Sequence, residues 1–234
     1  MKRVLNFSGG KTSAYMVIKY YQPGDLVIFC DTGREHPSTY KFIADFEKNE
    51  NIPIIKLAYP GGFEKLIEKK KAVPNQFMRF CTIELKIKTC RKYLRKLGYY
   101  KYENFIGFRY DEPLRVKRRK QIWKNVIDIF PLYNDKINKQ QINDYWKSKN
   151  YQLDIPSILG NCTLCFMKGK NAIINILMHY PELADVWIKD EKNTKRTYFK
   201  GITIEQLKNI STNTLFKDYK LENINPAFDC ACTS

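Results

Sequence analysis

Short apolar runs alternate with amphipathic stretches through the first half of the chain. The runs have the length of buried strands, and apolar residues between them recur at helical spacing. The predicted strands are residues 4–7, 26–30, 52–57, 104–107 and 126–130. The predicted helices are residues 13–21, 38–49 and 83–97. This alternation predicts an α/β fold: a doubly wound, mostly parallel, Rossmann-like sheet with helices on both faces.

The pattern becomes mostly helical after Pro131. Helical periodicity is present in residues 139–149, 171–179 and 182–189, and strand-like runs are scarce. We therefore expect an α/β core at residues 1–130 and a mostly helical C-terminal region at residues 131–234. Because no Gly/Ser-rich stretch separates the two parts, the border should not be a flexible linker.

Composition favours a globular protein of ordinary solubility. Of the 234 residues, 44% are hydrophobic, which is enough for a sizeable core. No apolar run approaches the roughly 18 residues that a membrane span needs. Met1, Lys2 and Arg3 lead directly into the first predicted strand, unlike a signal peptide. We expect a cytoplasmic protein with no membrane partner.

Positive charge is in large excess. There are 41 Lys and Arg residues against 24 Asp and Glu, a net charge of +17, with basic runs at 69–71 and 116–120. Such a field attracts polyanions, including nucleotides, DNA and RNA. A generally lysine-rich composition would produce the same charge without a nucleic-acid partner, so both interpretations stay open.

A glycine turn joins the first predicted strand to the first predicted helix. Its sequence is Ser8-Gly9-Gly10-Lys11-Thr12-Ser13. Glycines allow backbone N–H groups to turn inward, while the lysine, the hydroxyls and the helix N-terminus all favour a phosphate. The turn ends like a Walker A loop, but that loop needs a glycine five residues before Gly10, where Leu5 stands. The turn predicts a phosphate site of another kind.

A second turn, Asp31-Thr32-Gly33, ends the second predicted strand. In doubly wound sheets, ligands bind at the carboxyl ends of strands near the switch point, so one ligand could contact both turns. Glu35 and His36 would face the same crevice. The alternative is that these groups only cap a helix or lie on the surface.

Further cations follow in two charged segments. Arg79 and Lys86 are candidate phosphate ligands on either side of Cys81, whose position at a helix start should lower its thiol pKa. Arg109 and Arg115 could grip a phosphate or sulfate bidentately. The alternative for this last segment is a solvated charged turn.

Cysteines make up the last chemical signal. Their number is odd, which argues against a disulfide framework and for metal binding or thiol chemistry. The seven are Cys30, Cys81, Cys90, Cys162, Cys165, Cys230 and Cys232. The C-x-x-C pair at 162–165 by itself is compatible with redox, zinc or iron–sulfur chemistry.

Five motifs in this order resemble the phosphoadenosine phosphosulfate (PAPS) reductase-like family of the PP-loop adenine nucleotide alpha-hydrolase superfamily, particularly its phage and mobile-element members. They are S-G-G-K-T-S-A-Y-M, D-T-G-x-E-H, R-F-C-T-x-E-L-K, G-x-R-x-D-E-P-x-R and G-N-C-x-x-C-F. The resemblance implies that the turn from Ser8 to Ser13 binds the phosphates of ATP or a related adenylyl nucleotide. It also implies that Asp31, Thr32 and Gly33 lie near the adenosine. Thr12 stands where the family usually has Asp.

The resemblance further implies a [4Fe–4S] cluster, which related proteins hold with a cysteine pair and a C-x-x-C. This chain keeps Cys81 but has Thr82 in place of the second cysteine of the pair. Cys81, Cys162 and Cys165 would then be ligands. The fourth would be Cys232 or Cys230 or, less readily, Cys90. Zinc takes the same ligands, so the metal stays open.

Three functions are compatible with these residues. The first is ATP-dependent adenylation and sulfur transfer to an acceptor such as DNA or RNA, with Mg²⁺ and a sulfur-donor protein. Lys11, Arg109 and Arg115 would stabilise the developing charge. The second is a sulfonucleotide reductase in which Cys230 or Cys232 attacks PAPS or adenylyl sulfate and a thiol protein reduces the product. The chain lacks the E-C-G-like ending of such reductases. The third is a non-catalytic nucleotide or nucleic-acid binding module.

Overall fold

A single parallel sheet forms the centre of the protein. The computed structural model describes residues 1–119 and 123–213. Its strands are β1 (Lys2–Asn6), β2 (Leu26–Asp31), β3 (Ile54–Ala58), β4 (Tyr102–Phe105) and β5 (Val126–Ile129), in the order β3-β2-β1-β4-β5. All neighbouring pairs are parallel. The chain builds outward from β1 to β3 and then returns to the other side of β1, so the topological switch point lies between β1 and β4.

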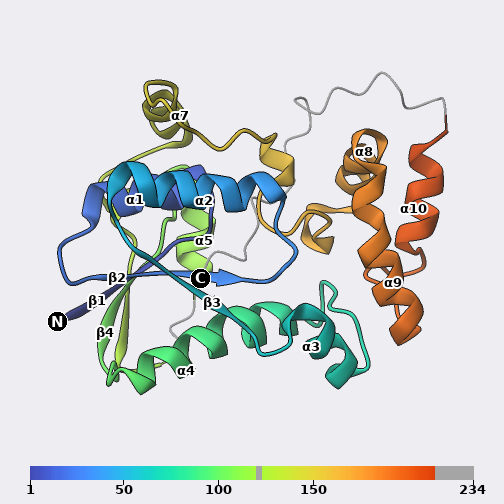
Figure 1. Ribbon diagram of the computed structural model, residues 1–234, viewed down its shortest axis with the longest axis horizontal. Coiled ribbons are helices and arrows are strands. Elements are labelled where there is room, and N and C mark those ends of the chain that lie inside the picture. Colours follow the sequence, from blue (N-terminus) through green and yellow to red (C-terminus); the bar gives the residue numbers. More distant parts are fainter. Residues whose placement is uncertain (120–122, 214–234) are drawn as a thin grey trace.

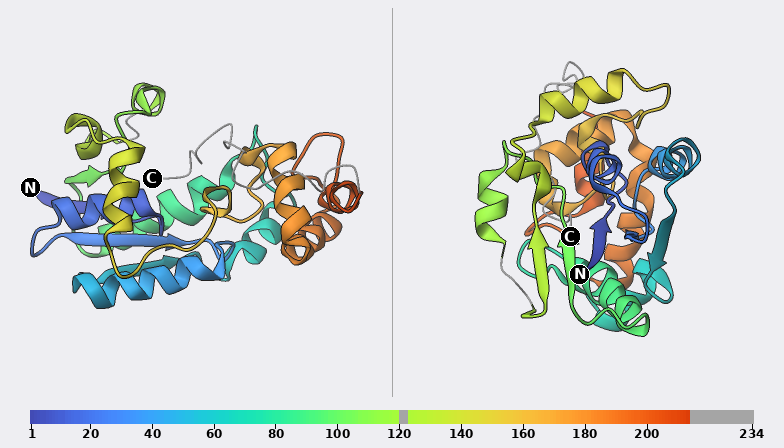
Figure 2. Two further views of the ribbon diagram at one scale, coloured as in Figure 1. Left: turned by 90° about the horizontal axis from the view of Figure 1, so that it is seen from above. Right: turned by 90° about the vertical axis from the view of Figure 1, so that its left-hand side faces the viewer.

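Helices cover both faces of the sheet, as Figures 1 and 2 show. Side chains of a strand alternate between faces. Leu5 and Phe29 therefore pack against α1 (Lys11–Tyr20) and α2 (Pro37–Glu50) on one face. Val4 and Ile28 pack on the opposite face against α4 (Thr89–Lys96). This confirms the predicted doubly wound α/β fold.

Part of the chain after β4 packs on the same face of the sheet as α1 and α2. The helices here are α5 (Pro113–Arg118), α6 (Pro131–Asn134) and α7 (Lys139–Lys147). Trp146 of α7 is fully buried in the same core as α1 and α2, and its indole Nε1 donates to the carbonyl of Lys11 at 2.9 Å. The segment after Phe130 thus helps to fix the start of α1.

A second core gathers the C-terminal helices at the end of the molecule opposite the N-terminus (Figures 1 and 2). It contains α3 (Gly62–Lys70), α8 (Lys170–His179), α9 (Ala184–Thr194) and α10 (Ile204–Ser211). Short 3₁₀ turns connect them at Ser157–Leu159, Phe166–Lys168 and Pro181–Leu183. The predicted division at residue 130 stays a prediction, but the two cores interleave along the chain: Phe63 lies in the second core and Trp146 in the first.

Several elements differ from the sequence prediction. The helix expected at 83–97 is a π-helix over Thr82–Lys88 followed by α4. The sequence analysis missed α3, α5, α6 and α10, all shorter than ten residues. None of the α5 residues is buried, so that helix carries no apolar stripe for a periodicity argument to detect.

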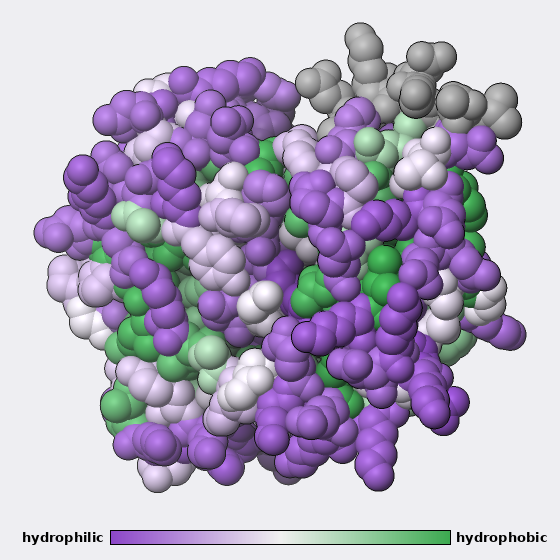
Figure 3. All heavy atoms as spheres, turned by 45° about the vertical axis from the view of Figure 1, so that its right-hand side comes forward, coloured by the Kyte–Doolittle hydropathy of each residue, from purple (hydrophilic) through white to green (hydrophobic). Residues whose placement is uncertain are grey.

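The outer surface is mainly polar on the face shown in Figure 3, where hydrophobic residues form separate patches. Over the two described ranges, no helix combines the length and the apolar character that crossing a bilayer requires.

Candidate functional site

The glycine turn after β1 is held in a conformation that few other sequences could adopt. Gly9 has φ of +77°, and a Cβ there would lie 2.6 Å from Cγ2 of Thr39. The backbone N–H of Ser8 donates to Oγ of Ser13 at 3.0 Å, and that hydroxyl donates to the Gly10 carbonyl at 3.0 Å. Since α1 begins at Lys11, the helix N-terminus opens directly from the turn. This is the arrangement that binds phosphates at helix N-termini.

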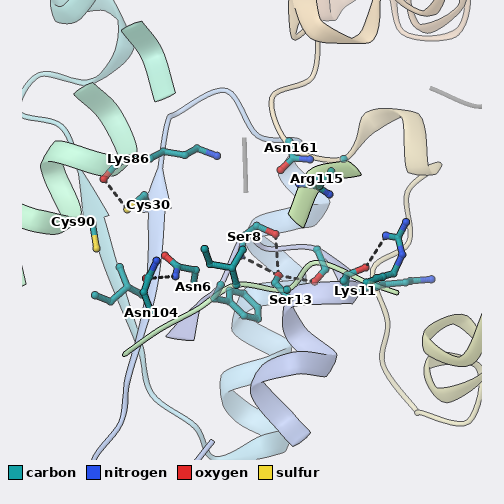
Figure 4. Close-up of a pocket in the computed structure, with 18 of the residues that line it drawn as sticks. Asn6, Ser8, Lys11, Ser13, Cys30, Lys86, Cys90, Asn104, Arg115 and Asn161 are labelled. Carbon is teal, nitrogen blue, oxygen red and sulfur yellow. Dashed lines mark hydrogen bonds between the residues drawn. The ribbon is translucent and has the colours of Figure 1, made fainter. Parts of the chain in front are cut away.

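A cavity of about 490 Å³ lies beside this turn, at the switch point between β1 and β4. Asn6 of β1 and Asn104 of β4 lie on its wall, joined by a side-chain hydrogen bond of 2.7 Å. Figure 4 shows how residues of this wall surround the space. The predicted phosphate-binding residues on the wall are Ser8, Gly10, Lys11, Thr12, Ser13, Lys86, Arg109 and Arg115. Gly160 and Asn161, from the motif that contains the C-x-x-C, also line the cavity. The structure therefore brings together residues of four of the five motifs, all except D-T-G-x-E-H.

Some predicted nucleotide-binding residues lie away from this wall. Asp31, Thr32, Gly33 and Arg79 are not among the residues that line the cavity, and Gly9 packs behind the turn. Asp31 accepts hydrogen bonds from the Gly33 N–H at 2.7 Å and from the Tyr40 hydroxyl at 2.8 Å, which closes its own turn. A role of this turn in nucleotide binding stays a prediction.

Glu35 and His36 build the local backbone. One Glu35 oxygen accepts from the N–H groups of Thr32 and Arg34, both at 3.2 Å, and burial raises the pKa of the carboxyl. His36 Nδ1 accepts from the Ser38 N–H at 3.2 Å and caps α2. These contacts match the structural alternative, a turn and a helix cap.

Arg109 and Arg115 are oriented by acidic neighbours. Arg109 is buried, with Nε 3.0 Å from Oδ1 of Asp111 and one terminal nitrogen 3.6 Å from Oε2 of Glu112. The other Glu112 oxygen contacts Arg115. Arg109 also donates to the Thr12 hydroxyl at 3.4 Å. A fixed guanidinium beside the turn costs little ordering entropy when an anion binds.

Lys11 lies at the entrance to the turn. Its ammonium donates to Oε1 of Gln152 at 3.2 Å, and partial burial lowers its pKa, an effect that Asp154 opposes. Partial desolvation strengthens the attraction between this cation and a phosphate.

Three of the cysteines line a second, much smaller pocket. Cys81, Cys162 and Cys165 share it with apolar side chains that include Phe63, Leu85 and Trp187. The Cys162 sulfur lies 3.3 Å from the Thr32 hydroxyl.

Cation and backbone contacts fix the C-x-x-C loop. The buried Lys168 ammonium donates to the carbonyls of Cys162 and Thr163, both at 2.8 Å, and the Thr163 N–H donates to the Arg34 carbonyl at 2.9 Å. The ammonium therefore ties two backbone carbonyls of the loop together.

The donor types in this pocket are those of an iron–sulfur cluster or a zinc site, because three thiols line it among mainly apolar side chains. In the part of the chain that the structure describes, no group of three or more His, Cys, Asp or Glu side chains is arranged closely enough to hold a metal ion. The candidate fourth ligands Cys230 and Cys232 lie outside the described residues. The metal stays a prediction. Cys90, the third candidate, lines the larger cavity instead.

Lys86 connects the two spaces. It lies on the π-helix and lines both the larger cavity and the cysteine pocket. Widened π turns occur frequently at functional sites. The sequence predicted this lysine as a phosphate ligand but contained no signal for its position between two pockets.

The sequence analysis also missed part of the cavity wall. Trp123 and Arg91 line it, with the guanidinium carbon 3.9 Å from the centre of the indole ring. Cys30 lines it as well. For Arg91 and Trp123, the only sequence signal was the basic run at 116–120, which lies close to Trp123.

Comparison with known proteins assigns the family. The model of the phosphoadenosine phosphosulfate reductase domain matches residues 2–154, which include the glycine turn and the arginine segment. The chain belongs to this family. The match ends before the C-x-x-C loop.

Family relatives include proteins of a phage and an archaeon. The "uncharacterized nin region protein ORF290" of Escherichia phage lambda is 30% identical, over 87% of this chain and 75% of its own length. The uncharacterized protein MJ0973 of Methanocaldococcus jannaschii is 27% identical, over 78% of this chain and 46% of its own. Among solved structures, the phosphoadenylyl-sulfate (PAPS) reductase of Candida auris in its phosphate complex has a TM-score of 0.43 and 16% identity, covering 63% of this chain and 72% of that one.

Proposed function

We propose that this protein is an ATP-dependent enzyme that adenylates an acceptor and then places sulfur on it. The observation that carries the proposal is the shared position of Lys86. The wall of the larger cavity combines the N-terminus of α1 with Lys11 and Arg109. Lys86 lines this cavity and also lines the three-cysteine pocket. The proposed nucleotide site and the three-cysteine pocket would therefore adjoin.

The proposed reaction has two redox-neutral steps. An acceptor oxygen attacks the α-phosphorus of ATP, the bond to the β-phosphate oxygen breaks, and pyrophosphate leaves as the acceptor becomes adenylated. A sulfide-level sulfur then attacks the activated centre, and AMP leaves with the former acceptor oxygen. Two displacements of good leaving groups thus replace one direct exchange of oxygen by sulfur.

The chain's own residues have separate tasks in this scheme. N–H groups of the turn from Ser8 to Ser13 would hold the departing pyrophosphate, and Mg²⁺ would accompany ATP. Lys11, Arg109 and Arg115 would stabilise the charge that develops on the phosphates. These cations would therefore act more strongly on the transition state than on bound ATP.

The three-cysteine pocket would hold the metal group. Cys81, Cys162 and Cys165 would be its ligands, with a fourth from elsewhere. A bound iron–sulfur cluster would supply a thiophilic site for the sulfur atom. Lys168 would stabilise the negative charge of the thiolates through its position beside the loop.

DNA or RNA is the acceptor class that the net charge of +17 favours. Helix α5 presents Lys117 and Arg118 as exposed cations on the same segment as Arg115, which lines the cavity. A polyanion bound across α5 would bring its reacting oxygen toward the nucleotide. A separate sulfur-donor protein completes the scheme.

Sulfonucleotide reduction is the second candidate, and the family match favours it. In that reaction a cysteine thiolate attacks the sulfur of PAPS or adenylyl sulfate, and a thiol protein then releases sulfite. Cys230 and Cys232, the predicted nucleophiles, lie outside the described residues.

A product assay on anaerobically purified protein separates the candidates. Pyrophosphate release from ATP that DNA or RNA stimulates would support adenylation and sulfur transfer. Sulfite release from PAPS with thioredoxin, without pyrophosphate release from ATP, would overturn it in favour of reduction. Tight ATP binding without release of pyrophosphate or sulfite would overturn both reactions and support the third function, a non-catalytic binding module. Arg196→Lys, at an exposed position that lines neither pocket, is the matched control for Arg109→Lys in each assay.

A further inference from the structure

Two cysteines outside the three-cysteine pocket meet in the wall of the larger cavity. Cys30 lies near the carboxyl end of β2, and Cys90 lies in α4, which packs against β2. Both side chains also pack against the same small hydrophobic cluster around Val4, Ile28 and Leu94. Both residues line the cavity and are only partly buried, so a small molecule in the cavity can reach them. Figure 4 shows the two side chains on facing elements beside Lys86.

The surroundings make the two thiols unequal. Interaction with the neighbouring Cys90 thiol lowers the pKa of the Cys30 thiol; the charge of Lys86 acts in the same direction, while burial and Glu35 oppose it. The pKa of Cys90 is raised by its interaction with Cys30 and by burial. In its protonated form, the Cys30 thiol donates to the Lys86 carbonyl at 3.7 Å. Cys30 is thus the better nucleophile, and Cys90 is placed to attack it afterwards.

We propose that Cys30 and Cys90 are a redox-active pair that forms a disulfide across the cavity wall. Because α4 packs on β2 and both side chains line one cavity wall, forming the bond requires movement of these two elements only. Neither residue lines the three-cysteine pocket, and Cys90, named above as a candidate fourth ligand, lies in the wall of the larger cavity instead, so the pair would be a second thiol function in the same protein.

A low-molecular-weight disulfide is the proposed oxidant. The Cys30 thiolate attacks one sulfur of that disulfide, the disulfide bond breaks, and one thiolate leaves and takes up a proton. The Cys90 thiol then loses its proton and attacks the Cys30 sulfur, which releases the second thiolate. Two protein thiols are oxidised to one disulfide, and the small disulfide is reduced to two thiols. An excess of small thiol reverses both steps.

The bond would link α4 to β2 at the place where Lys86 enters the cavity. A ligand that fills the cavity would cover both sulfurs and slow the oxidation. This last consequence rests on the proposed nucleotide site, whereas the disulfide itself does not.

Peptide mapping of the full chain tests the pair. The reduced protein is equilibrated with oxidised glutathione, quenched with acid, alkylated and digested. We expect a cross-linked peptide that contains Cys30 and Cys90 and that excess reduced glutathione removes. Both cysteines remaining alkylated to the same extent as before oxidation would overturn the proposal.

Two variants test the order of attack. In Cys90→Ser, we expect Cys30 to accumulate as a mixed disulfide with glutathione. In Cys30→Ser, Cys90 should react with oxidised glutathione at about one tenth of the rate of Cys30 in Cys90→Ser, or at a still lower rate, because Cys90 lacks the stabilised thiolate. Equal rates in the two variants would contradict the assigned roles. The wild-type cross-link provides the test if a variant fails to fold.

A non-hydrolysable ATP analogue separates this proposal from the proposed function. We expect the analogue to slow cross-linking in the wild-type protein. A cross-link that forms at the same rate with and without the analogue would support the pair and count against nucleotide in this cavity. Analogue binding without any cross-link would overturn the pair and leave the nucleotide site standing.

Discussion

Arg34 donates to both carboxylate oxygens of Asp190, at 3.1 and 2.9 Å, although the two residues lie on opposite sides of the border between the sheet and the helical end. Their side chains are 2% and 3% exposed. The same Arg34 nitrogen also lies 2.9 Å from Oε1 of Glu64 in α3. Because the next residue, Glu35, forms an isolated bridge with Cys162, this ion pair helps to hold the C-x-x-C loop against the sheet.

Asp190→Asn should therefore be strongly destabilising. It leaves a buried guanidinium without its main charge partner, for which a loss of about 3–5 kcal/mol in the free energy of unfolding is typical. Urea denaturation of both proteins measures the difference. The matched control is Asp45→Asn, which removes an exposed ion pair to Lys41 and should cost less than about 1 kcal/mol. Similar losses in the two variants would contradict the role assigned to Asp190.

Gly9→Ala tests the shape of the glycine turn. The new Cβ would clash with Thr39 at 2.6 Å and sit at positive φ, so we expect reduced stability and weakened nucleotide binding. Gly98→Ala is the control: its φ of +73° is similar, but no atom lies within 4 Å of the new Cβ. The stability difference between the two variants, on the order of 1–3 kcal/mol, reports the clash alone. Thermal unfolding and calorimetric titration with ATP would provide both values.

Arg109→Lys should weaken nucleotide binding more than it affects stability. A lysine cannot reproduce the planar guanidinium that contacts both Asp111 and Thr12. We expect the dissociation constant for ATP to rise about tenfold or more, the effect of losing a charged hydrogen bond. Arg196→Lys, at an exposed position away from both pockets, should leave it within about twofold, because an exposed surface charge contributes little. An unchanged constant for Arg109→Lys would place the phosphates elsewhere.

Lys86→Gln should change the pH dependence of Cys30 alkylation. The lysine charge lowers the pKa of the Cys30 thiol, so its removal should raise that pKa and move the midpoint of the rate profile to higher pH. At a fixed pH below the midpoint, the alkylation rate should fall because less thiolate is present. Lys88→Gln, on the same π-helix but paired with Glu84, should leave the profile in place. Iodoacetamide labelling followed by mass spectrometry measures both profiles.

Much of the fold was predictable because its signals are local. The strand-like run at Val4–Phe7 and the apolar face of α1 are patterns of neighbouring residues in the chain. Parallel strands also require the crossovers that the helices supply. Helix α5 was missed for the converse reason: it buries nothing, so no pattern marks it. The π-helix at Thr82–Lys88 was likewise unpredictable, because a widened turn has no distinct spacing of apolar residues.

The sequence by itself determined which chemical groups the chain offers: a glycine turn at Ser8–Ser13 of the type that suits a phosphate, arginines after β4, and thiols in a C-x-x-C pair. Backbone conformation and side-chain type are local properties, and they can be read along the chain. Tertiary structure decided which groups meet. Only the packing of α4 on β2 brings Cys30 to Cys90, and only the path of the π-helix puts Lys86 in the walls of two pockets. Contacts between distant residues depend on how whole elements bury their apolar faces, and no short stretch of sequence contains that information.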